Sequence, residues 1–125
     1  MLGDNQAVAT VAVRDLAAAK KFYAEVLGLK QVDAEGEEAV VYKTGAGQLT
    51  VYRSQFAGTN RATGVTWNVG QGIDALVRDL KTRGVAFEHY DMPDMKREGD
   101  IHSAGGTRAA WFKDPDGNIH GLVTR

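Results

Sequence analysis

The sequence predicts an α+β domain in which two curved mixed sheets pair, because it repeats one β-α-β-β-β unit. Val13 and Val69 occupy equivalent places in the two copies, and so do Gly28 and Gly84, each pair 56 positions apart. Between these anchors each copy shows a strand, a turn, an amphipathic helix and a glycine that ends the helix. A chain built twice from one unit usually places its active cleft between or within the copies, so the repeat also indicates where a site should lie.

The first copy begins with an apolar strand at 7–13, followed by a helix. The strand segment is short and rich in β-branched residues, which is typical of a strand covered on both faces. The Asp15 carboxylate can cap the first turn of the helix. Apolar side chains then recur every three or four residues from Leu16 to Leu27, and Gly28 can end the helix in a left-handed conformation. Further strands are predicted at 30–34, 39–44 and 48–53.

The second copy follows a polar linker at 54–63 and repeats the strand and helix. Its predicted elements are a strand at 64–69, a helix from Ile73 to Gly84, a strand at 85–91, and a hairpin of strands 107–113 and 118–124 turned at 114–117. A polar loop at 92–106 separates the strand at 85–91 from this hairpin. Loops of that length are uncommon inside compact domains, so it is either a lid over a site or a surface excursion.

Composition excludes several classes of protein. The 125 residues suit one domain, 1–125, with modules at about 6–56 and 64–125. The 15 basic and 16 acidic residues give a net charge of −1, and no basic patch suits nucleic acid. Cysteine is absent, which excludes disulfides and thiolate chemistry. No secretory signal and no membrane-spanning apolar run is present, so we expect a cytoplasmic protein that binds neither nucleic acid nor membrane.

Two segments resemble the end motifs of the vicinal-oxygen-chelate superfamily: VAVRDLAAAKKFYAEVLGL at 11–29 and AAWFKDPDGNIHGLV at 109–123. This superfamily includes glyoxalase I, extradiol dioxygenases, fosfomycin-resistance transferases and bleomycin-resistance proteins. The match spans essentially the whole chain and its order of elements. It implies paired βαβββ modules whose sheets curl into an open cup, and frequent dimers. It leaves the reaction open, because the superfamily hosts lyases, oxygenases, transferases and binding proteins.

The resemblance also implies where metal-dependent relatives carry their ligands, on the first and last strand of each module. In this sequence the corresponding positions are Val8, Val51, Gly64 and Gly121. None has a side-chain donor, whereas a divalent metal needs at least three imidazole or carboxylate donors. A register shift by one residue gives Ala9, Thr50, Val65 and His120, which is not a ligand set either. We therefore expect no metal and no other cofactor, with a relocated site built on other histidines and acids as the alternative.

Strand alternation predicts which side chains line the cup. The candidate ligand-binding residues are Thr10, Val51, Arg53, Asn68, Tyr90, Trp111 and Gly121. Arg53 could pair with an anionic or carbonyl group, and Trp111 and Tyr90 could offer flat faces to an aromatic ligand, although core packing or solvation would explain each of them too. Whether Trp111 or Phe112 faces inward stays open. Glycine at 64 and at 121 should leave space for a ligand.

Two histidines are the candidates for catalysis. His102, which is close to Asp100 in the sequence, could act as a general base from the loop at 92–106, and His89 ends a predicted strand. His120 should point away from the cup if its neighbour Gly121 faces it. The sequence contains no nucleophile motif, phosphate loop or dinucleotide fingerprint.

The sequence is compatible with more than one function. We expect a small-molecule-binding protein that lacks the usual metal ligands, in the manner of resistance-type sequestration proteins. The alternative is a glyoxalase- or dioxygenase-like enzyme, either metal-free and using Arg53, His89 or His102, or with relocated metal ligands. The expected partner is a small-molecule ligand, and open sheet edges favour a homodimer.

Overall fold

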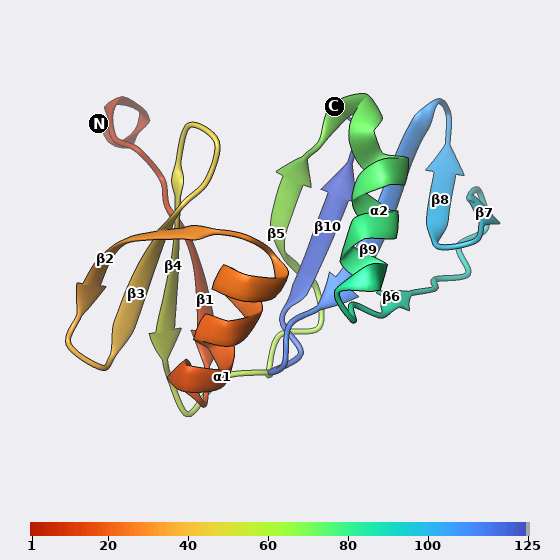
Figure 1. The fold of residues 1–125 in the computed structure, drawn as a ribbon. Helices are drawn as coiled ribbons and strands as arrows, with labels where there is room; N and C mark the ends of the chain where they lie inside the picture. Colours follow the sequence, from red (N-terminus) through yellow and green to blue (C-terminus); the bar gives the residue numbers. More distant parts are fainter. Residues whose placement is uncertain (125) are drawn as a thin grey trace. The chain divides into compact units, whose positions relative to one another are not determined.

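The computed structural model describes residues 1–124, which form two compact units (Figure 1). The first unit comprises Met1–Asn60 with Pro115–Asn118, and the second comprises Arg61–Asp114 with the segment that begins at Ile119. Each unit contains one principal helix and one mixed sheet. The predicted α+β class is therefore confirmed.

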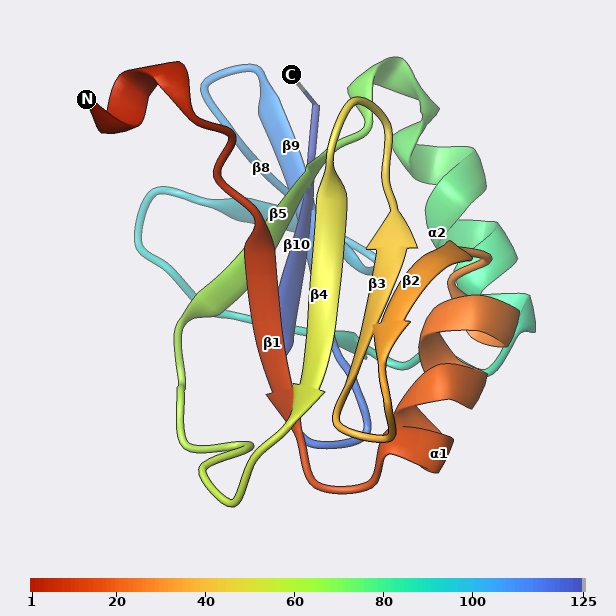
Figure 2. The same ribbon diagram turned by 90° about the vertical axis from the view of Figure 1, so that its left-hand side faces the viewer.

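The sheet of the first unit has the strand order β1-β4-β3-β2, seen face-on in Figure 2. Its elements, after a short 3₁₀ turn at Leu2–Asp4, are β1 (Ala9–Val13), α1 (Leu16–Lys20), β2 (Lys30–Glu35), β3 (Ala39–Lys43) and β4 (Gln48–Arg53). The pair β1–β4 is parallel, whereas β2–β3 and β3–β4 are antiparallel. The helix crosses between the first strand and the last three, as the sequence predicts.

The first helix is α-helical for five residues and continues as a π-helix, η2, at Lys21–Val26. The Asp15 carboxylate accepts hydrogen bonds from two backbone N–H groups of the first turn, at 2.9 and 3.2 Å, which confirms the predicted cap. At the other end Gly28 has φ +73°, and the Leu29 N–H donates to the Tyr23 carbonyl at 2.9 Å. Gly28 thus ends the helix as predicted, but the closing bond reaches one residue further back than in a Schellman motif, because the preceding turns are π-helical.

The sheet of the second unit repeats the strand order of the first and extends it. Its elements are β5 (Thr63–Asn68), a 3₁₀ turn η3 (Gly70–Gly72), α2 (Ile73–Thr82), β6 (Phe87–Glu88), β7 (Lys96–Glu98), β8 (Ile101–Ala104), β9 (Thr107–Lys113) and β10 (Ile119–Val123). The order is β5-β10-β9-β8-β7, with β6 also paired to β9. The series β5-β10-β9-β8 matches β1-β4-β3-β2, so β8 is the equivalent of β2.

The prediction of a loop over 92–106 is wrong, because this segment contains the two strands β7 and β8. Strands β7 and β8 pair as a hairpin whose two-residue turn is Gly99–Asp100, and β8 then pairs with β9 across a second turn, Gly105–Gly106. Both glycines of the second turn have positive φ, +55° and +86°, as a tight hairpin requires. The strand predicted at 85–91 is reduced to β6. Neither a lid nor a simple surface loop describes this segment.

Each core lies between a sheet and its helix. In the second unit α2 covers one face of the sheet (Figure 1). The buried apolar side chains of that layer include Ile73, Val77, Leu80, Ala110, Phe112 and Leu122. No helix among residues 1–124 combines the length and the apolar character needed to cross a membrane.

One glycine of the first unit is required by a close approach of two backbone segments. Gly58 has φ +76°, and a Cβ at this position would lie 2.5 Å from the Asp116 carbonyl oxygen. We expect Gly58→Ala to lower the free energy of unfolding by about 2 kcal/mol, through backbone strain and this clash. Gly36→Ala is the matched control, because Gly36 has φ +55° but open space around it. It should cost only about 1 kcal/mol in a urea titration, and equal losses would contradict the clash.

Candidate functional site

The candidate site lies on the face of the second sheet that is turned away from α2, called here the distal face. On β9, Arg108 forms two hydrogen bonds to Asp74 of α2, at 2.8 and 2.6 Å, so its strand neighbours Ala109 and Trp111 point the other way. In the pairing of β8 with β9, His102 is opposite Ala109, and in the pairing of β10 with β9, Gly121 is opposite Trp111. His102 and Gly121 are therefore also on the distal face. The distal face also carries Thr66 and Asn68 at the edge of the sheet.

Three rings form a cluster on the distal face. The centroid of the Trp111 ring lies 5.3 Å from that of Tyr90 and 5.0 Å from that of His102, both nearly perpendicular to it. The Tyr90 and His102 rings are 6.1 Å apart. Trp111 and Tyr90 remain partly exposed, whereas Phe112 is buried against Phe87 on the α2 side. Of the two residues between which the sequence left the choice open, Trp111 is therefore on the distal face and Phe112 on the face toward α2.

Gly121 accommodates the Trp111 indole and does not leave empty space. A Cβ on Gly121 would lie 3.0 Å from Trp111 Nε1 and 3.2 Å from Cδ1. The expectation of open space at this glycine is therefore wrong, because a neighbouring aromatic side chain fills it. At Gly64 the nearest atom to such a Cβ is the Ile119 carbonyl oxygen at 3.8 Å, an ordinary van der Waals contact, so a Cβ fits there without crowding. Gly64 is the extra residue of a bulge between β5 and β10.

His102 lies in strand β8 and is completely buried, at 0% exposure. The Tyr90 backbone N–H donates to its Nε2 at 2.9 Å. Nε2 must therefore carry the lone pair, and the proton of the neutral ring lies on Nδ1. That Nδ1 has no hydrogen-bond partner among the described residues. His102 thus presents a buried, unused N–H donor within the ring cluster.

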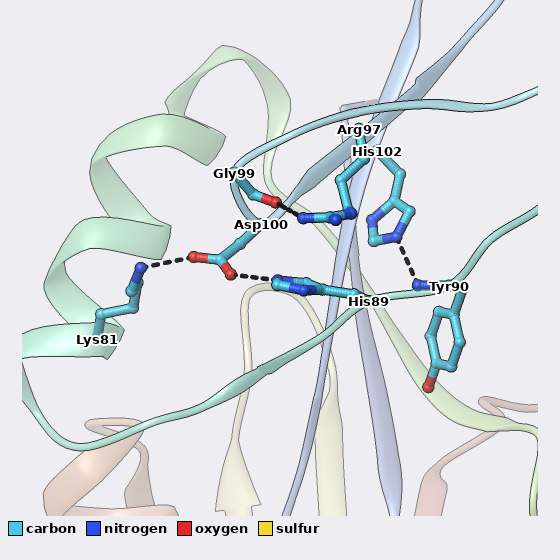
Figure 3. A network of polar contacts seen from close by, with 7 residues as sticks. All are labelled: Lys81, His89, Tyr90, Arg97, Gly99, Asp100 and His102. Atoms are coloured by element: carbon cyan, nitrogen blue, oxygen red, sulfur yellow. Dashed lines mark hydrogen bonds and ion pairs between the residues drawn. The ribbon is translucent and has the colours of Figure 1, made fainter.

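His89 belongs to a separate network on the α2 side (Figure 3). Its Nε2 lies 2.8 Å from Asp100 Oδ1, and Lys81 Nζ of α2 lies 2.7 Å from Asp100 Oδ2. Asp100 is only 13% exposed, whereas His89 is 45% exposed. The hydrogen bonds from Lys81 and then from His89 lower the pKa of the Asp100 carboxyl. His89 and His102, the two catalytic candidates, therefore do not share a site, although one short segment carries His89 and the Tyr90 that binds His102.

His120 is part of the core beneath α2. Its ring is fully buried, accepts a hydrogen bond at Nδ1 from Trp67 Nε1 at 3.0 Å, and stacks on Phe112 at 5.0 Å. Burial lowers the pKa of His120 to about 4, with the opposing charge of Asp114 a smaller effect. The prediction that His120 points away from the face of Gly121 is confirmed by their alternation along β10.

The first-unit candidates do not share one face. Val51 pairs with the buried Val11 and Val40, in the core beside α1, whereas Thr10 pairs with Thr50 on the other face. The prediction that Val51 and Thr10 line one surface is wrong. The loop before β4 has four residues and the loop before β10 has five, so aligning their glycines shifted the register by one residue.

Arg53 lies at the end of β4, where an ion pair occupies its guanidinium. Its Nη2 lies 3.1 Å from Glu38 Oε1 and its Nε lies 3.4 Å from Oε2. The two side chains border an open hollow of about 370 Å³ that Arg14, Ser54 and Gln55 complete. Arg53 is thus next to a hollow of the first unit, but not on the surface that carries Thr10.

The side chains at the family's metal positions do not fit a metal ion. With the register corrected, those positions are Val8, Thr50, Gly64 and Gly121, which supply at most one hydroxyl. The Trp111 indole further occupies the space at Gly121. Among residues 1–124 no group of three or more histidine or acidic side chains is arranged to hold a metal. The residues at these positions therefore do not form a metal site.

Arg97 is a site residue that sequence reasoning missed. It lies directly opposite His102 in the β7–β8 hairpin, so both side chains are on the distal face. Its Nη1 donates to the Gly99 carbonyl at 2.7 Å. The signal was present in the sequence, because Gly99–Asp100 is a two-residue hairpin turn between alternating segments. The strongly polar composition of 92–100 concealed it.

Comparison with known proteins identifies the class to which this fold and site belong. The family model of the Glyoxalase/Bleomycin resistance protein/Dioxygenase superfamily matches residues 5–120. The chain therefore belongs to this superfamily, and the resemblance of its end motifs is confirmed. A search of curated protein sequences finds no significant match.

Solved structures with the same fold cover nearly the whole chain. Oxidase ChaP-H2 is 24% identical, covers 97% of this chain and 93% of its own, and gives a TM-score of 0.70. A lactoylglutathione lyase from Agrobacterium tumefaciens is 19% identical over 95% and 92%, with a TM-score of 0.69. The fosfomycin resistance protein FosX from Mesorhizobium loti is 14% identical over 98% and 92%, also with a TM-score of 0.69. At these identities the similarity concerns the fold.

Proposed function

We propose that the chain binds a small organic molecule on the distal face of its second unit, without a metal ion, and sequesters it. The observation that carries this proposal is the Trp111 indole, which fills the space at the metal-ligand position Gly121. A half-exposed aromatic surface, bordered by Tyr90 and Asn68, replaces the cation there. Aromatic surfaces with a few polar groups are the usual composition of small-molecule sites. The names of FosX and of the lactoylglutathione lyase also point to small-molecule ligands.

The chain contains its own internal control for this proposal, because it has two tryptophans on opposite faces. A ¹⁵N-labelled sample should show two indole N–H signals, which Trp111→Phe and Trp67→Phe assign. We expect planar neutral probes such as indole and benzyl alcohol to shift the Trp111 signal and leave that of Trp67 in place. Trp111→Ala should weaken probe binding about tenfold, the loss of one stacked ring. Equal shifts of both signals, or no shift, would contradict the proposed site.

A second function, metal-free catalysis, is favoured by the His89–Asp100 pair. A carboxylate that is mostly shielded from solvent and holds an exposed imidazole in one tautomer is the arrangement used to orient a general base. Mass spectrometry of probes recovered after incubation separates the two functions. A sequestration protein returns its probe unchanged, whereas an enzyme converts it and loses that conversion in His89→Gln. Metal analysis of protein purified without chelator should give well below one divalent ion per chain under either function.

Two expectations from the sequence remain predictions, the homodimer and the cytoplasmic location. The edge strand β2 has all of its residues exposed, which leaves a row of backbone groups available to a second copy. Light scattering of the purified protein tests the dimer directly.

A further inference from the structure

The buried donor on His102 calls for an acceptor. Its Nδ1–H lies inside the protein without a partner among residues 1–124, while Nε2 is already used by the Tyr90 backbone. Leaving a buried donor unsatisfied costs about 1–3 kcal/mol, and native proteins rarely tolerate it. The acceptor that satisfies it must therefore come from outside residues 1–124. An oxygen acceptor from a ligand, or a trapped water, would complete this bond.

Arg97 favours an acceptor with negative charge. The register pairs Arg97 with His102 across β7 and β8, and Figure 3 shows the two side chains side by side. Arg97 is exposed and its one hydrogen bond to the described residues is to the Gly99 carbonyl. Its other N–H groups are free to bind an anion, and a guanidinium forms its strongest hydrogen bonds with carboxylates.

The rest of the cluster favours a planar group next to that charge. Trp111 and Tyr90 are partly exposed, and each contacts the His102 ring. A ligand oxygen at Nδ1 would therefore place the adjoining part of the ligand against an aromatic surface. Stacking of two rings contributes about 0.5–1.5 kcal/mol beyond the area that is buried.

We propose that the ligand of the distal face is an aromatic carboxylate. One carboxylate oxygen accepts the His102 Nδ1–H, the Arg97 guanidinium binds the same group, and the ring stacks on Trp111. This inference rests on the proposed small-molecule function and adds the chemical class of the ligand.

The test compares benzoate with benzyl alcohol, which have the same ring but differ in charge. We expect benzoate to bind more tightly, to shift the Trp111 indole signal, and to move the His102 Nδ1 proton downfield in ¹⁵N-labelled protein. Arg97→Gln should weaken benzoate binding about tenfold and leave benzyl alcohol unchanged. The matched control is Lys96→Gln, because Lys96 is exposed on the same strand but pairs with Ser103 and faces the other way. It should change benzoate binding less than twofold.

The possible failures are distinguishable. If benzyl alcohol binds as well as benzoate and Arg97→Gln affects neither, the carboxylate assignment is wrong while the proposed function stands. If the His102 Nδ1–H is hydrogen-bonded to a long-lived water molecule that benzoate does not displace, the carboxylate assignment is also wrong. If no aromatic probe shifts Trp111, the proposed function itself fails.

Discussion

The free energy of unfolding should fall by about 3 kcal/mol between pH 7 and pH 4 because of His120 alone. Burial lowers its pKa from 6.5 to about 4 in the folded protein. The unfolded chain therefore takes up the proton at higher pH than the folded one. Above pH 7 the imidazole is neutral in both states and contributes no pH dependence. As the pH falls through 6.5 the unfolded state gains stability, until the folded state is also protonated near pH 4.

Urea titrations at half-unit pH steps measure this loss, and two variants identify its source. His120→Gln keeps an acceptor for the Trp67 indole N–H but cannot titrate, so its stability should be nearly constant between pH 6.5 and 4. Trp67→Phe removes that hydrogen bond and leaves His120 in the core, so its acid sensitivity should persist. The pKa values of the Asp74 and Asp100 carboxyls are lowered in the folded protein. These two groups therefore affect stability only below about pH 4, where their protonation lowers the free energy of unfolding further. A His120→Gln profile parallel to that of the parent would contradict the assignment.

The sequence predicts those parts of the fold that local chemistry determines. The Asp15 cap, the glycine end at Gly28 and the apolar stripe of each helix depend on neighbours within a turn, and all are found. The repeat across Val13 and Val69 likewise predicts the strand that precedes each helix. These features need no knowledge of distant contacts.

The β7–β8 hairpin escaped prediction because its signal is nonlocal. Strand β7 is polar and fully exposed, so it has no apolar alternation and is held only by pairing with β8. Strand β8 is only four residues long, and it is recognisable as the equivalent of β2 only from its position beside β9 in the sheet. With the hairpin missed, positions 97 and 102 were both assigned to one loop, and the pairing of Arg97 with His102 across two strands was not predicted.

The face of the sheet to which each strand side chain points was also predicted poorly, because a shift of one residue in register moves a side chain to the opposite face. A single extra residue in the turn before β10 was enough to assign Val51 to the wrong face. The choice between Trp111 and Phe112 depended on which ring fits beneath α2, which alternation alone does not decide. The inference that survives both errors is chemical: in neither register do the four residues supply the three imidazole or carboxylate donors that a metal ion needs.

The second large effect is expected from Gly121→Glu, which places a carboxylate at the position where metal-binding relatives have a ligand. We expect it to lower the free energy of unfolding by about 3 kcal/mol, because its side chain would crowd the Trp111 indole, which lies 3.0 Å from the Cβ position, and its charge would be buried. Gly64→Ala is the matched control on the neighbouring strand, where a Cβ makes only an ordinary van der Waals contact, and it should change stability by less than about 0.5 kcal/mol.

A double-mutant cycle with Trp111→Ala separates the overlap from the charge. If the indole is the obstacle, Gly121→Glu should cost about 1–3 kcal/mol less in the Trp111→Ala background than in the parent. Additive losses would show that the indole does not occupy the space beside Gly121. The double variant should still fail to gain divalent-metal affinity by calorimetry, because Val8, Thr50 and Gly64 supply no carboxylate or imidazole to join the new one. The residues without metal donors lie on the first and last strand of each module, so no single substitution should restore a ligand set.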